Sequence, residues 1–316
     1  MSGVKLSIDR AGKVFEGRAG SVTALEDVSL DVPAGQFLTV VGPSGCGKST
    51  LLDLLAGLTA PSAGRILLNG APITGPGPDR GTVFQQYALL PWRTALRNIE
   101  FALEGRGLSR RLRSDTARTY LDLVGLSGFA DRFPHELSGG MRQRVAIARA
   151  LAFDPEVLLM DEPFAALDAQ TRESLQDELL RIWQDTNKTV VFITHAIDEA
   201  VYLGQRVAVL TSRPGRIKAV IDVDLGDRAA VEDIRSDPAF VSYRHRIWAE
   251  LRDEVAAAQR KELGASAVPK ASAGPTALEA PATPRDANET DPVHARPAPH
   301  SHDPVDQEHR EVVPLG

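Results

Sequence analysis

The sequence has few of the features that mark secreted or membrane-spanning proteins. No apolar run approaches the ~18–20 residues that cross a bilayer as a helix. Charged residues stand in the opening MSGVKLSIDR, where a signal peptide needs an apolar segment. The only cysteine, Cys46, cannot form an internal disulfide, which suits a reducing compartment. We therefore expect a cytoplasmic chain. Any role at a membrane would be exerted from the aqueous side and not by spanning the bilayer.

An excess of positive charge is also missing. The formal net charge is -6 at pH 7, whereas proteins that bind duplex nucleic acid usually carry clustered Lys and Arg residues. Nucleic acid is therefore not expected as the main partner. Hydrophobic residues make up 43% of the chain and charged residues 25%, which are ordinary values for a globular protein with a sizeable core.

Short apolar runs alternate with helical patterns over residues 4–223, which predicts an α/β fold. Strands are predicted at residues 36–41, 65–68, 81–84, 156–160, 189–193 and 206–211. Helices are predicted at residues 48–56, 114–124, 139–152, 169–186 and 197–203. Residues 4–32 indicate an antiparallel β subdomain beside the parallel sheet, and residues 86–152 an inserted α-helical subdomain.

Two regions follow the main domain, which we place at residues 1–225. In the extension at residues 226–263, a helix is predicted at 237–263, because one apolar face repeats at spacings of three and four. We expect this face to pack on the main domain rather than on a partner. Its members are Phe240, Tyr243, Ile247, Leu251 and Val255. Residues 264–316 contain nine of the 21 prolines and no aromatic residue, so we expect a disordered tail.

The strongest local signal is GPSGCGKST, which fits the phosphate-loop pattern G-x-x-x-x-G-K-[ST]. An apolar strand precedes it and an amphipathic helix follows, and glycines let successive N–H groups surround a phosphate. Lys48 would reach the β- and γ-phosphates, and the Ser49 hydroxyl would ligate Mg²⁺. The alternative is a glycine turn before a helix. The loop comprises Gly42, Pro43, Ser44, Gly45, Cys46, Gly47, Lys48, Ser49 and Thr50.

Polar residues end two later strands of the predicted sheet. The run VLLMDEP ends in Asp161, which would hold Mg²⁺, and Glu162, a candidate for polarising the attacking water. His195 follows the strand at 189–193 and could hydrogen-bond a γ-phosphate. The alternatives are a solvated strand end for the acids and a capping or packing role for the histidine.

A second anion-binding construction stands at LSGGM, where Ser138, Gly139 and Gly140 open a helix. A plain serine-capped helix is the alternative. One chain has no need of two such constructions for one nucleotide, unless a second copy supplies one of them.

Together these motifs resemble the ATP-binding cassette (ABC) transporter ATPases over residues 4–225. GPSGCGKST resembles the Walker A loop, VLLMDEP Walker B with Glu162 as catalytic base, and LSGGM the signature, with Met141 where Gln is usual. The resemblance further implies a Q-loop glutamine that ligates Mg²⁺, a D-loop aspartate, a switch histidine and an aromatic that stacks on adenine. These are Gln85, Asp168, His195 and Phe15.

The resemblance implies a P-loop NTPase fold, ATP and Mg²⁺ as ligands, and ATP hydrolysis. It implies a head-to-tail homodimer in which ATP lies between Lys48 of one copy and Ser138 of the other. It also implies membrane-spanning permease subunits, a periplasmic or extracytoplasmic substrate-binding protein, and a peripheral position on the cytoplasmic face of the inner membrane.

Within the family, residues 75–81, 89–93 and 213–217 are similar to importers of taurine, aliphatic sulfonates and nitrate. Residues 234–240 are most like the taurine branch, although the usual Leu-Pro-Arg-Pro-Arg reads differently at 225–228. A nitrate importer is the alternative. An SMC-like or repair ATPase would need a long coiled coil before the signature, which the sequence lacks. A GTPase or small-molecule kinase would leave LSGG and the tandem acids unexplained.

Overall fold

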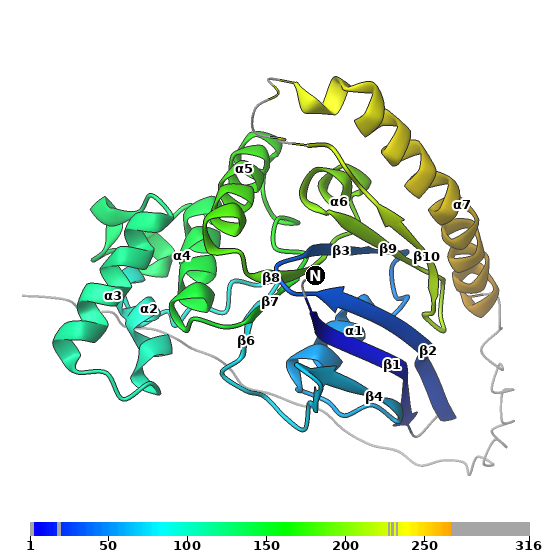
Figure 1. The fold of residues 1–316 in the computed structure, drawn as a ribbon, viewed down its shortest axis with the longest axis horizontal. Helices are drawn as coiled ribbons and strands as arrows, with labels where there is room; N and C mark the ends of the chain where they lie inside the picture. Colours follow the sequence, from blue (N-terminus) through cyan, green and yellow to red (C-terminus); the bar gives the residue numbers. More distant parts are fainter. Residues whose placement is uncertain (1–2, 18–19, 227, 229–230, 232, 267–316) are drawn as a thin grey trace, which may run out of the picture. The chain divides into compact units, whose positions relative to one another are not determined.

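The computed structural model describes residues 3–17, 20–226, 228, 231 and 233–266 (Figure 1). The tail expected to be disordered lies outside the described residues, except that residues 264–266 end the last helix. None of the described helices is long and apolar enough to span a bilayer.

A 6-stranded sheet in the order β10-β9-β3-β8-β7-β6 forms the centre of the α/β unit. Its strands are β3 (Phe37–Val41), β6 (Arg80–Val83), β7 (Val157–Asp161), β8 (Thr189–Ile193), β9 (Arg206–Leu210) and β10 (Ile217–Asp222). All neighbours are parallel except β10, which pairs antiparallel with β9. The continuous apolar character of β3 and β8 follows from this, because parallel strands are covered on both faces.

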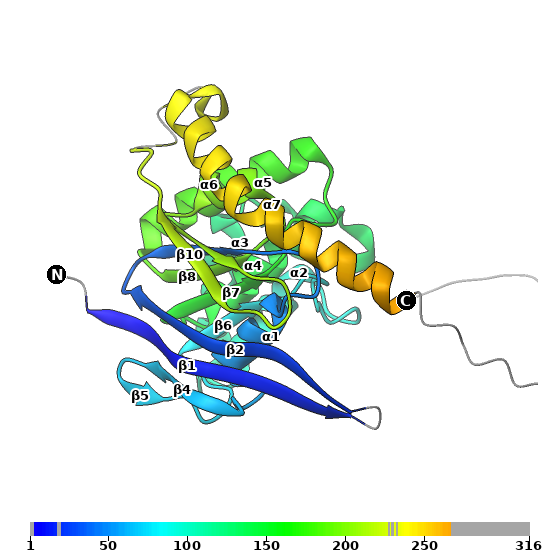
Figure 2. The ribbon, with the colours of Figure 1, turned by 90° about the vertical axis from the view of Figure 1, so that its right-hand side faces the viewer.

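A 4-stranded antiparallel sheet in the order β2-β1-β4-β5 lies beside helix α1 (Figure 2). Its strands are β1 (Val4–Gly17), β2 (Gly20–Pro33), β4 (Ala63–Leu68) and β5 (Ala71–Pro72). Helix α1 (Lys48–Ala56) contacts β2 on one side and β7 and β8 on the other. The antiparallel sheet predicted at residues 4–32 is therefore confirmed, and α1 connects the two sheets.

Helices fill the rest of the described structure. Between β6 and β7 lie α2 (Ala95–Glu104), α3 (Arg110–Leu123) and α4 (Gly139–Ala152), which gather on one side of the central sheet (Figure 1). Then follow α5 (Ala169–Thr186), α6 (Ile197–Leu203) and α7 (Pro238–Ser266). Short 3-10 helices occur at Ser127–Phe129, Pro134–Glu136 and Ile234–Ser236.

The main differences from the sequence predictions are elements that were not singled out, strand β10 among them, and one helix start. Helix α2 was not singled out, and α3 begins at Arg110 rather than 114. Each start is fixed by a side chain that accepts a backbone N–H: Thr94 from Arg97 at 3.3 Å and Ser109 from Leu112 at 3.3 Å. The first turn of α3 is rich in arginine, so apolar periodicity could not reveal it.

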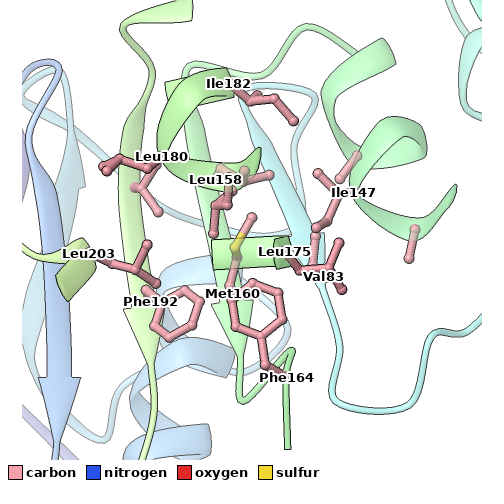
Figure 3. Packing of buried hydrophobic residues seen from close by; sticks show 14 of the residues in the cluster. Val83, Ile147, Leu158, Met160, Phe164, Leu175, Leu180, Ile182, Phe192 and Leu203 are labelled. Atoms are coloured by element: carbon pink, nitrogen blue, oxygen red, sulfur yellow. The ribbon is translucent and has the colours of Figure 1, made fainter. Parts of the chain in front are cut away.

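Alternate residues of the central strands pack into two separate clusters. Met160 of β7 and Phe192 of β8 face α4 and α5 (Figure 3), while Leu159 and Val191 face α1. The ring centroid of Phe192 lies 6.0 Å from that of Phe37 and 5.6 Å from that of Phe164. This two-residue alternation is what buries both faces of the sheet.

Helix α7 packs by the apolar face that the sequence predicts. Phe240, Ile247 and Leu251 are buried, and the helix contacts α6, β9 and β10. It also runs on to Ser266, beyond the predicted end at 263.

We expect Phe192→Ala to lower the free energy of unfolding by about 3–5 kcal/mol, because it leaves a cavity between the rings of Phe37 and Phe164. Urea titration followed by circular dichroism measures this. The control Phe129→Ala removes a ring that is 42% exposed and should change stability by no more than about 0.5 kcal/mol. Equal, small effects of both substitutions would contradict the assigned core.

Candidate active site

Five parallel strands end at one edge of the central sheet, and each is followed by a residue singled out from the sequence or by a basic residue; β6 is followed by Gln85. Strand β3 leads into the loop at Gly42, β7 into Glu162, β8 into His195 and β9 into Arg213. Ligands of open α/β sheets bind at this carboxyl edge. The fold therefore gathers the residues of interest although they are far apart in the sequence.

The phosphate loop is wound tightly between β3 and α1. Gly45 and Gly47 have φ angles of 70° and 104°, and a Cβ at Gly47 would lie 2.9 Å from the Ala24 carbonyl oxygen. The buried Lys48 ammonium donates to the carbonyl oxygens of Gly42 at 2.9 Å and Pro43 at 3.1 Å. The loop thus holds a positive charge in a fixed position beside the N-terminus of α1, an arrangement suited to an anion.

A cavity of about 300 Å³ opens over this loop. Phe15 and Ala24 of the antiparallel sheet form one wall, and Glu162 and Arg213 lie on others. The Phe15 ring is 46% exposed, and the Lys13 ammonium lies 5.2 Å from its centroid. Phe15 is therefore available for stacking a flat ligand. The other lining residues are Val22, Ser44, Gly45, Gly47, Lys48, Ser49 and Thr50. A larger cavity of about 580 Å³ lies away from the phosphate loop, along α5, and contains none of these residues.

Glu162 and His195 form a pair at this edge. Nδ1 of His195 lies 3.0 Å from Oε2 of Glu162. The Glu162 backbone N–H donates to the carbonyl of Ile193 at 3.0 Å, and its φ angle is 42°. A non-glycine residue in this left-handed region costs about 1–3 kcal/mol and is found disproportionately at functional sites. The backbone conformation of Glu162 and its contact with His195 together fix the orientation of this carboxylate.

Asp161 has the properties expected of a cation ligand. Its Oδ1 is buried without a hydrogen-bond partner. Burial raises the pKa of its carboxyl group, and a hydrogen bond with Ser49 and the charge of Lys48 oppose that rise. Mg²⁺ prefers carboxylate and hydroxyl oxygens, often with only one or two carboxylates. The oxygens of Asp161 and Ser49 therefore fit Mg²⁺. A larger metal cluster, of three or more His, Cys, Asp or Glu side chains, does not occur among the described residues.

His195 is supported from behind by a buried polar network. The Thr194 hydroxyl donates to Oε2 of Glu199 at 2.6 Å and accepts from the Ala196 N–H at 3.0 Å. Oε1 of Glu199 lies 3.6 Å from Arg172, which donates to the Leu167 carbonyl at 2.9 Å. Burial raises the pKa of Glu199. This network connects the backbone at His195 to the segment before Asp168.

Neither Asp161 nor His195 lines the cavity over the phosphate loop, and the remaining candidates do not line it either, as far as the described residues show. Ser138 caps α4 by accepting the Met141 N–H at 3.2 Å, and Asp168 caps α5 by accepting the Thr171 N–H at 3.0 Å. Gly139 follows Ser138, and a Cβ on Gly140 would lie 2.5 Å from Thr171. Gln85 is exposed after β6. The Cys46 side chain is buried, and burial raises the pKa of its thiol.

Sequence reasoning did not identify Arg213 as a site residue. Its Nε donates to the Gly45 carbonyl at 3.1 Å, and its side chain lines the cavity. The available signal was its position just after β9, which pairs with β3 and so ends beside the phosphate loop.

Known proteins are similar to this chain in sequence and in fold. Residues 25–165 match the ABC transporter family. An uncharacterized ABC transporter ATP-binding protein of Methanocaldococcus jannaschii is 54% identical over 255 residues, covering 80% of this chain and 93% of that protein. The nitrate import ATP-binding protein NrtD of Synechocystis is 49% identical over 252 residues (78% and 95%). The taurine import ATP-binding protein TauB of Yersinia pestis is 50% identical over 228 residues (71% and 89%).

A solved structure agrees with these relatives. It is a dimeric, post-hydrolysis ATP-binding cassette bound to ADP and phosphate, with a TM-score of 0.63 and 33% identity over 69% of this chain and 99% of that one. The sequence relatives and the shared fold lead to one conclusion. The chain belongs to the ABC transporter family, as an ATP-hydrolysing subunit of the subgroup that includes the nitrate and taurine import proteins.

Proposed function

We propose that this chain powers import of a small sulfonate by hydrolysing ATP, with Glu162 as the catalytic base. One observation carries the catalytic part: the Glu162 carboxylate lies 3.0 Å from His195 at the same sheet edge as Lys48 and Ser49. A base must be held where it can reach an attacking water, and these contacts hold it.

The residues around the cavity divide the work of binding. The N–H groups of Gly45 and Gly47 and the Lys48 ammonium bind the phosphates, and Phe15 stacks on the adenine. Ser49, Asp161 and Gln85 are the residues that would hold Mg²⁺. When bound, the ion neutralises charge on the phosphate oxygens.

Hydrolysis then needs one proton transfer. A water attacks the γ-phosphorus while Glu162 accepts its proton, and the bond to the β-phosphate oxygen breaks to give ADP and phosphate. His195 keeps the Glu162 carboxylate in place through Nδ1, and with a proton on each ring nitrogen it also donates from Nε2 toward the γ-phosphate.

We propose that two copies pair head to tail. Ser138, Gly139 and Gly140 open α4 with a helix N-terminus and lie outside the cavity of their own chain. A second copy would supply them, together with Asp168, to the nucleotide bound at Lys48. The similar cassette solved as a dimer with ADP and phosphate supports dimerisation.

The surface around Trp92 is the proposed contact with the permease. Trp92 is 71% exposed, yet its segment is firmly held. The buried Asn98 accepts the Leu90 N–H at 2.8 Å, and Arg149 donates to the Ala88 carbonyl at 2.6 Å. A rigidly presented, exposed tryptophan is typical of a binding hot spot. The chain would then sit peripherally on the cytoplasmic face of the inner membrane, with an extracytoplasmic binding protein delivering cargo.

The cargo we propose is taurine or another aliphatic sulfonate. Support comes from residues 234–240 and from the 50% identity to a taurine import protein. Ile234 and Phe240 are buried, so they do not touch cargo. Their segment bears on the cargo only because it resembles the taurine branch of the family. Nitrate is the second candidate, because the match to a nitrate import protein extends over 252 residues.

We expect Glu162→Gln to lower ATP hydrolysis by about 10²-fold or more while ATP binding and an ATP-held dimer persist, because only the proton acceptor is lost. Phosphate release and size-exclusion chromatography with ATP measure the two properties. Lys48→Ala should instead weaken ATP binding itself. The control Glu173→Gln changes an exposed glutamate of α5 and should behave like the native chain. Turnover near the native rate in Glu162→Gln would exclude Glu162 as the base.

We expect Trp92→Ala to leave ATP binding by the isolated subunit unchanged but to reduce assembly or transport with the permease, because it removes the exposed anchor. Co-purification and uptake by the assembled complex measure this. Phe129→Ala, which truncates another exposed aromatic of the helical subdomain, is the matched control. Unimpaired uptake with Trp92→Ala would remove this surface from the coupling path.

We expect a strain lacking the gene to fail to grow on taurine or alkanesulfonates as sole sulfur source, with normal growth on sulfate. The native gene should restore growth and the Glu162→Gln variant should not, because import requires hydrolysis. Normal growth on every sulfonate, combined with loss of growth on nitrate as sole nitrogen source, would assign the nitrate branch and leave the ATPase assignment intact.

A further inference from the structure

The loop between β9 and β10, residues 211–216, lies between the phosphate loop and α7. Its own hydrogen bonds make it compact: Thr211 N–H donates to the Arg216 carbonyl at 3.0 Å, and the Thr211 hydroxyl donates to the Pro214 carbonyl at 2.9 Å. A compact loop moves as a unit, so contacts on one side affect the position of the other.

One side of this β9–β10 loop packs directly on the phosphate loop. Arg213 Nε donates to the Gly45 carbonyl at 3.1 Å. Gly215 approaches the phosphate loop so closely that a Cβ there would lie 2.2 Å from the Cys46 carbonyl oxygen. Gly215 N–H also donates to the carbonyl of Ala24, which lines the nucleotide cavity, at 2.9 Å. The β9–β10 loop thus supports the phosphate loop from outside.

The other side is held by a carboxylate of α7, which lies along β10 (Figure 2). Oε2 of Glu254 accepts the Ser212 N–H at 2.8 Å, and Oε1 lies 3.2 Å from the Lys218 ammonium. Partial burial by itself raises the pKa of Glu254, but the Ser212 N–H and Lys218 outweigh it and hold that pKa below its usual range. The group is therefore ionised at neutral pH, and such charge-assisted bonds are about twice as strong as neutral ones.

We propose that Glu254 is a positioning residue through which the C-terminal helix α7 sets the phosphate loop for ATP binding. Ser212 and Arg213 are adjacent, so fixing the Ser212 N–H fixes the point from which the Arg213 side chain reaches Gly45. The inference rests on the proposed ATP site at this loop. It assigns a role in nucleotide affinity to the C-terminal extension, which lies outside the cassette motifs.

The test is ATP binding and steady-state hydrolysis by the full chain carrying Glu254→Ala. We expect Kd and KM for ATP to rise about 3–10-fold, because one charge-assisted bond in the chain of contacts is lost. The kcat at saturating ATP should stay within about 2-fold, because neither the base nor the Mg²⁺ ligands are touched. Glu254→Gln retains an oxygen that can accept the Ser212 N–H and should restore most of the affinity.

The matched control is Glu250→Ala, one turn earlier on α7. The Glu250 carboxylate lies 3.8 Å from the same Lys218 and makes no hydrogen bond to the β9–β10 loop among the described residues. It should leave Kd unchanged. A double-mutant cycle adds a second criterion: Glu254→Ala should have little further effect on Kd in an Arg213→Ala background, because both act on Gly45 in series.

An unchanged Kd in Glu254→Ala would overturn the proposal, and so would equal losses of affinity in Glu254→Ala and Glu250→Ala. A variant that loses kcat and melting temperature together would also overturn it, by showing a merely structural role. These outcomes differ from failure of the proposed ATP site, in which Lys48→Ala would bind ATP as tightly as the native chain.

Discussion

The parallel register of four strands is the constraint on which the active site depends. In this register Asp161 pairs with Ile193, Ile193 with Val40, and Val40 with Ala208, so one row crosses β7, β8, β3 and β9. The residues that follow this row therefore lie at the same level along the strand direction, at the carboxyl edge of the sheet. The carboxylate at 162, the phosphate loop and the β9–β10 loop therefore meet without any long connecting segment, and slippage of one strand would separate them.

Electrostatics at this edge are arranged before any ligand binds. The Lys48 ammonium is held by two carbonyl oxygens of its own loop, and Asp161 retains a buried oxygen without a partner. Both groups have lost most of their hydration, which costs free energy unless charge is matched. A nucleotide phosphate and a divalent cation would match these two charges. Because the charged groups are already in position, binding requires less rearrangement of the protein.

Much of this architecture could be predicted from the sequence, because its signals are local. The apolar run before Gly42 and the glycines after it define a strand, a loop and a helix without reference to distant residues. Helix α2 was missed although its signals are local too, since Leu96, Ile99 and Leu103 are buried at helical spacing and Thr94 caps the start. The support of the phosphate loop by Arg213 and Glu254 was hidden, because only the sheet register and the packing of α7 bring these side chains to it. Contacts between distant segments have no periodicity to reveal them.

The left-handed backbone at Glu162 has a consequence for how this protein can change. Glycine and asparagine tolerate a φ of 42° better than glutamate does, so either would relieve the strain at this position. Neither can accept a proton from water. Stability and turnover therefore make opposite demands on residue 162, and selection for thermal robustness alone would drive the chain toward a well-folded protein that binds ATP without consuming it.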